Sequence, residues 1–182
     1  LKRPARPITI FDLLTHTAGV ANTNSPRHES TLGELVMSYS KTPLNFEPGS
    51  KWSYSNAGIN TLGRIVEVVS GIPFADFLQE RVLDPCDMKD TTFWPSKEQA
   101  KRIAKSYRPD QKGELQQVEV RFLAGGISNR KRTPYPAGGL YSTAGDVTRF
   151  YQMMLNGGVF NGKRVLNKKT VELMTQTQTG DI

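Results

Sequence analysis

The stretch Phe46-Glu-Pro-Gly-Ser-Lys-Trp-Ser-Tyr-Ser-Asn-Ala-Gly58 marks the point where a loop turns into a helix. Its Pro-Gly pair is typical of a turn. Beyond it, apolar residues recur at the i, i+3, i+4 and i+7 spacing of one helix face, and Gly71 stands where a glycine commonly ends a helix. These apolar residues are Leu62, Ile65, Val66 and Val69. Tyr54 and Asn56 therefore lie at a loop-to-helix junction, where side chains are held firmly while they face solvent.

Tyr54 and Asn56 carry the chemistry of this junction. A phenol can transfer a proton, and a carboxamide can hydrogen-bond a substrate amide or a lysine. The Tyr-x-Asn pattern also arises by chance, in which case Tyr54 would be a half-buried ring and Asn56 the N-cap of the helix. The tripeptide alone leaves both interpretations open.

Further helices and one hairpin are predicted around this junction. Thr9 with Asp12, and Thr31 with Glu34, have the spacing of capping boxes that open helices. Leu13 and Leu14 would face the core. The expected elements are a short helix ending near Gly19, helices over 32–40, 73–83 and 97–102, strands over 104–108 and 114–121, a helix capped by Ser142 or Thr143, and a last helix over 167–174. The later capped helix would turn Val147, Phe150, Tyr151 and Met154 to one face.

Composition supports one globular domain over residues 1–182, because 37% of the residues are hydrophobic and 23% charged. The net charge of +7 comes from basic residues spread along the chain, so we expect no nucleic-acid partner. Cys86 is the only cysteine, which excludes an intrachain disulfide and a cysteine metal cluster. No run approaches the ~20 apolar residues of a membrane span.

Three blocks, in order, resemble the serine β-lactamase and penicillin-binding-protein family, particularly its class C-like, esterase and D-amino-peptidase branches. They are residues 8–19, 46–58 and 136–146, the last reading Pro136-Ala-Gly-Gly-Leu-Tyr-Ser-Thr-Ala-Gly-Asp146. The resemblance implies the helical portion of an α+β β-lactamase/transpeptidase-like fold, and thus a mainly α chain with a small β-hairpin. It also implies hydrolysis of an amide, β-lactam or ester in a small molecule or peptide, with no metal or cofactor, and slightly favours a periplasmic or extracellular location.

The same resemblance implies roles for individual residues. Tyr54 would be the general base or proton relay for a serine nucleophile, and Asn56 the amide that positions substrate. Gly138 and Gly139 could bring backbone close to the substrate. Their alternative role is a simple turn into the helix that follows.

The nucleophile of this family belongs to a Ser-x-x-Lys that opens an apolar helix well before the tyrosine. The chain has two such strings, beginning at Ser38 and Ser128, and neither has this position or setting. We therefore expect a central piece of the domain, with the serine upstream of Leu1, the Lys- or His-Thr-Gly strand downstream of Ile182, and no turnover by the piece alone. The alternative is a non-catalytic module that binds peptide, glycan or a protein partner.

Other polar residues have plainer expected roles. His16 has only one other histidine in the chain and no carboxylate at ligand spacing, which indicates a structural turn residue rather than a triad or metal ligand. Glu67 and Asp146 lie on predicted helices without an acidic partner. We expect both to be helix-cap or surface charges.

Overall fold

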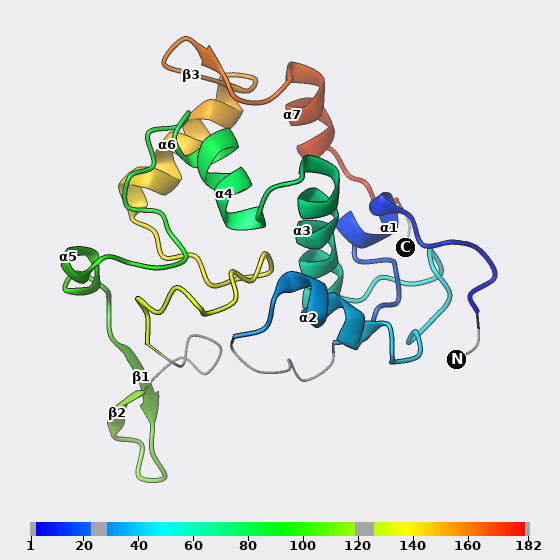
Figure 1. The fold of residues 1–182 in the computed structure, drawn as a ribbon, viewed down its shortest axis with the longest axis horizontal. Helices are drawn as coiled ribbons and strands as arrows, with labels where there is room; N and C mark the ends of the chain where they lie inside the picture. Colours follow the sequence, from blue (N-terminus) through cyan, green and yellow to red (C-terminus); the bar gives the residue numbers. More distant parts are fainter. Residues whose placement is uncertain (1–2, 23–28, 119–125, 181–182) are drawn as a thin grey trace.

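The chain folds into a mainly helical structure with two small hairpins (Figure 1). The computed structural model describes residues 3–22, 29–118 and 126–180. Within these ranges the elements are α1 (Ile10–Leu14), α2 (Leu32–Tyr39), α3 (Asn56–Ser70), α4 (Phe74–Leu78), a π-helical turn (Gln79–Leu83), α5 (Lys97–Ala100), β1 (Ser106–Pro109), β2 (Leu115–Val118), α6 (Ala144–Leu155), β3 (Val159–Phe160), β4 (Lys163–Arg164) and α7 (Lys168–Met174). No helix in these ranges is long and apolar enough to cross a membrane.

Local capping signals decide where the helices begin. Both expected capping boxes form, at Thr9 with Asp12 and at Thr31 with Glu34. Thr143, rather than Ser142, caps α6 by accepting a hydrogen bond from the backbone N–H of Asp146. At the other end of α3, Gly71 takes a left-handed conformation with φ 76°. The sequence rules therefore hold for these helix starts and for the end of α3, because they act within a single turn. The first helix is shorter than expected, since it ends at Leu14 rather than near Gly19.

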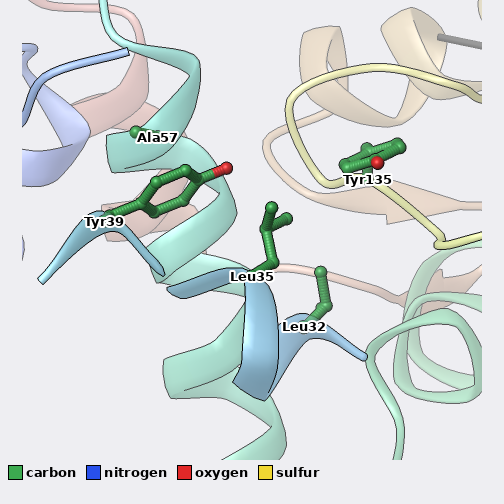
Figure 2. Packing of buried hydrophobic residues seen from close by; sticks show 5 residues of the cluster. All are labelled: Leu32, Leu35, Tyr39, Ala57 and Tyr135. Atoms are coloured by element: carbon green, nitrogen blue, oxygen red, sulfur yellow. The ribbon is translucent and has the colours of Figure 1, made fainter. Parts of the chain in front are cut away.

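Helix α3 is the central element, and α1, α2 and α4 pack against it. Its inner face differs from the expected one. Val69 is 82% exposed, while Ala57, Asn60 and Gly63 are buried. Ala57 and Gly63 lie on the buried face because small residues let neighbouring segments approach the helix closely. A core cluster then forms beside Ala57, with side chains from α2 and from the segment before α6, as Figure 2 shows for Leu32, Leu35, Tyr39 and Tyr135.

Two apolar expectations are corrected by the packing. Leu13 is buried but Leu14 is 59% exposed, so only one of the pair faces the core. The helical stretch expected over 73–83 does form, with α4 up to Leu78 followed directly by the π-helical turn up to Leu83. In α6, Tyr151 is 61% exposed and Met153 is fully buried, because α6 packs against a second cluster that also contains Leu83, Cys86, Met88 and Phe160.

Asp146 is a buried residue, and its assignment as a surface charge was wrong. It is 2% exposed and accepts hydrogen bonds from the backbone N–H of Asp90 at 2.7 Å and from Thr91 Oγ1 at 2.9 Å. Arg149 donates to its other oxygen at 2.7 Å. A buried carboxylate is tolerated when it is paired in this way. Glu67 does serve as a cap, since it accepts from the N–H of Phe74 at the start of α4.

The sequence predicted the first of the two hairpins but not the second. β1 pairs with β2 in antiparallel register, with Ser106 opposite Val118, close to the expected strands. The part of the second predicted strand from residue 119 to 121 lies outside the described residues. The β3–β4 hairpin was not predicted, and its two-residue strands carry too little pattern to detect.

The first helix is fixed by the buried carboxylate of Asp12. This group accepts hydrogen bonds from the N–H of Thr9 at 2.8 Å and from both terminal nitrogens of Arg6 at 2.7 Å. The Arg6 guanidinium, together with the Thr9 donors, holds the pKa of Asp12 well below its usual range. Arg6 itself stays 45% exposed, so solvent screens part of this attraction.

Replacing Asp12 with Asn should lower the free energy of unfolding by about 2 kcal/mol at pH 7, because hydrogen bonds to a charged acceptor are lost. A carboxyl with a depressed folded-state pKa stabilises above its unfolded pKa of about 4, and this contribution disappears as the pH falls through the lower folded-state value. The D12N deficit, measured by urea unfolding, should therefore shrink toward pH 2. Glu98→Gln, which removes an exposed ion pair with Lys101, is the matched control and should cost under about 0.5 kcal/mol. A deficit that is constant with pH would contradict this account.

Gly63→Ala should destabilise the fold by about 1–3 kcal/mol through overpacking. A Cβ at this position would lie 2.1 Å from Cγ of Pro136, whose ring cannot swing away. Gly33→Ala on α2 is the control, because its Cβ would meet the Arg64 guanidinium at an ordinary 3.5 Å. Thermal unfolding of both variants tests the prediction, and equal melting temperatures for G63A and G33A would refute it.

Candidate functional site

The Tyr54-Ser-Asn56 turn presents two side chains to solvent from a rigid base. Tyr54 is 55% exposed and Asn56 is also exposed, whereas Ser55 between them is 7% exposed. Ser55 is the N-cap of α3 and accepts a hydrogen bond from the N–H of Gly58 at 3.0 Å. The alternative in which Asn56 is the N-cap of the helix was therefore wrong, because Ser55 is the N-cap. Both side chains are left available to a ligand.

Asn22 fastens this turn, and sequence reasoning missed it. Its Nδ2 donates to the carbonyl of Tyr54 at 3.1 Å, and its Oδ1 accepts from the N–H of Ala57 at 3.1 Å. The Ser55 hydroxyl donates to the Val20 carbonyl at 2.8 Å. No local pattern marks Asn22, because its partners lie more than 30 residues away along the chain.

His16 lies in the turn after α1, as expected of a structural turn residue, with φ 61°. Its Nδ1 accepts a hydrogen bond from the N–H of Ser55 at 3.1 Å, and its ring centroid lies 4.7 Å from that of Tyr54. The Trp52 ring meets it edge-on at 6.0 Å. The histidine block and the tyrosine turn are thus one structural unit.

Gly138 and Gly139 belong to a segment that docks on the first turns of α3. Asn60, one turn after Asn56, is 4% exposed and accepts a hydrogen bond from the N–H of Ala137 at 3.0 Å. The other end of its amide donates to the Tyr39 hydroxyl at 3.0 Å. Gly138 has open space where a Cβ would be, and Gly139 has φ 106°. Asn60 therefore ties the glycine segment to the helix that begins at Asn56.

The two Ser-x-x-Lys serines lie in other settings. Ser38 is near the end of α2, and its hydroxyl donates to the Leu35 carbonyl at 2.6 Å. Ser128 lies in a loop and donates to the Pro95 carbonyl at 2.6 Å. Neither begins a helix. In the described part of the chain, no three His, Cys, Asp or Glu side chains gather as a metal site would need.

A cavity of about 700 Å³ lies beside the glycine segment rather than at Tyr54. It is bounded by the chain from α5 into β1 and by Leu140 to Thr143, which directly follow Gly139. Tyr54 and Asn56 are not among its lining residues. The exposed Tyr54-Ser-Asn56 turn is the candidate site, because a phenol can transfer a proton and a carboxamide can hydrogen-bond an amide.

Comparison with known proteins assigns the chain to a family. The family model described as Beta-lactamase matches residues 1–181. Penicillin-binding protein 4 of Amycolatopsis lactamdurans is 32% identical, and lovastatin esterase of Penicillium rubens is 31% identical; each alignment covers 97% of this chain and 46% of the relative. The chain thus spans about half the length of these curated relatives.

The fold agrees with that assignment. The octameric penicillin-binding protein homologue from Pyrococcus abyssi superimposes with a TM-score of 0.71 at 22% identity, over 97% of this chain and 40% of that structure. The expected fold class, a mainly α chain with small hairpins and a β-lactamase-like arrangement, is confirmed. The chain belongs to the β-lactamase family.

Proposed function

We propose that this chain supplies the Tyr-x-Asn part of a serine hydrolase that cleaves an amide, β-lactam or ester bond through an acyl-enzyme. One observation carries the proposal. The phenol of Tyr54 and the amide of Asn56 are exposed on a turn whose backbone is held by hydrogen bonds of Ser55 and Asn22. Catalytic groups need this combination of exposure and rigid support. The names of the relatives, one an esterase and one a penicillin-binding protein, are consistent with the same bond classes.

In the proposed reaction, Tyr54 moves the proton. As the phenolate, it takes the proton from the serine hydroxyl while the serine oxygen attacks the substrate carbonyl. The resulting phenol then returns that proton to the departing amine or alcohol. A water molecule then attacks the acyl-serine ester, giving the acid and the free serine. Asn56 hydrogen-bonds the substrate amide or carbonyl and orients it, and the Gly138–Gly139 backbone lies beside the bound substrate.

We place the serine nucleophile outside residues 1–182 and therefore propose that the chain alone has no turnover. Ser38 and Ser128, the only residues in Ser-x-x-Lys strings, use their hydroxyls on backbone carbonyls away from helix starts. An acyl-enzyme needs its nucleophile and activating lysine, and loss of such a unit removes nearly all the chemical acceleration.

Intact-mass spectrometry after incubation with a fluorophosphonate, and separately with a penicillin, should show a covalent adduct on the complete gene product and none on residues 1–182. Peptide mapping should then locate the modified serine. An adduct on Ser38 or Ser128 would reverse the placement of the nucleophile. An unlabelled complete product would instead favour the non-catalytic binding module.

Tyr54→Phe in the complete product should slow acylation by about 10²–10⁴-fold, the usual contribution of a positioned proton-transfer group. Stopped-flow measurement with p-nitrophenyl acetate gives this rate directly. Tyr107→Phe is the control, since Tyr107 on β1 is 53% exposed, much like Tyr54, but lies on the projecting hairpin. Equal acylation rates for the Y54F and Y107F variants would remove Tyr54 from the mechanism.

A further inference from the structure

The residues on either side of Tyr54, Ser53 and Ser55, both donate their backbone N–H groups to one residue, His16. The N–H of Ser53 donates to the His16 carbonyl at 3.0 Å, and the N–H of Ser55 donates to His16 Nδ1 at 3.1 Å. The Tyr54 backbone is therefore bracketed on each side by contacts to the same residue. Neither contact could be read from the sequence, where these residues are nearly 40 positions apart.

The histidine ring also contacts the tyrosine ring. The two centroids are 4.7 Å apart with a 39° tilt, within the range of favourable aromatic pairs. The Trp52 ring also meets the His16 ring edge-on, with the centroids 6.0 Å apart and the planes at 78°. The imidazole thus contacts both aromatic side chains of the Trp52-Ser-Tyr54 segment, and its contact with Tyr54 restricts the motion of that ring.

The backbone of His16 adopts a conformation that costs free energy for most residues. Its φ of 61° is in the left-handed region, where non-glycine residues persist when their surroundings over-determine them. This conformation is what directs Nδ1 and the carbonyl oxygen of one residue to two amides of the same loop. Because Nδ1 accepts, the ring proton of His16 resides on Nε2.

We propose that His16 is the positioning residue for Tyr54, fixing the backbone through two hydrogen bonds and the phenol ring through aromatic contact. The inference rests on the proposed role of Tyr54, and it goes beyond the expectation of a purely structural turn histidine. His16 itself need not touch the substrate. Its effect on the reaction passes through the placement of the phenol oxygen, for which a displacement of about 1 Å can cost 10²-fold in rate.

Two substitutions separate this role from simple support of the turn. Asn tolerates a left-handed φ and places Oδ1 on Cγ, as histidine places Nδ1, so His16→Asn keeps the acceptor. Glycine tolerates the same φ without any side chain, so His16→Gly removes the acceptor and the ring but adds no backbone strain. Both variants retain the carbonyl that receives the Ser53 N–H.

Amide hydrogen exchange of the full chain, read by NMR, provides the first test. H16G should speed exchange of the Ser55 amide about tenfold, whereas H16N should keep it within about twofold of wild type. The Ser53 amide is an internal control and should stay equally protected in all three proteins. Loss of protection at Ser53 and Ser55 together, or no loss at Ser55 in H16G, would overturn the proposal.

Turnover of p-nitrophenyl acetate by the complete gene product provides the second test. H16G should lower kcat about tenfold or more with KM within about twofold, and H16N should recover part of that loss. A kcat unchanged in H16G would contradict the positioning role. A wild-type product without turnover would overturn the proposed function instead, and the exchange comparison would still decide whether His16 fixes the Tyr54 peptide.

Discussion

The start of helix α3 sets the constraint on which the site depends. The first amides of a helix have no partners within it and must find acceptors elsewhere. Here Ser55 Oγ receives the N–H of Gly58, and Asn22 Oδ1 receives the N–H of Ala57. Asn22 can do this only if residues 16–22 lie against the turn. The hydrogen bonds that meet this requirement also hold the backbone of Tyr54 and Asn56, on either side of the buried N-cap Ser55.

Buried polar groups, rather than apolar contacts alone, decide which segments meet around α3. Asn60 joins α2, α3 and the Ala137 segment, Asp12 joins Arg6 to α1, and Asp146 joins α6 to residues 90–91. Each such group would be costly to bury without its partners, so each specifies which segments lie beside it. The face of α3 that carries small residues lets these segments come close to the helix, as the approach of Pro136 to Gly63 shows.

This architecture exposes two polar side chains on a backbone that hydrogen bonds hold in place. The Tyr54 and Asn56 side chains face outward, while the backbone between them is held by Ser55, Asn22 and His16. Rigid backbone under exposed side chains reduces the ordering that a reaction must impose.

The sequence by itself determined several helix starts, the end of α3, the first hairpin, the family and the Tyr-Ser-Asn turn, because caps and turn residues such as Thr31 and Gly71 act within a few positions. Periodicity did not determine which faces are buried, since Val69 and Tyr151 are exposed and Asp146 is buried. Only the tertiary structure brought Asn22 to Tyr54, His16 to Ser55 and Asn60 to Ala137. These pairs are 32 to 77 residues apart, and a hydrogen bond between such distant groups exists only once the packing of whole helices has placed both partners.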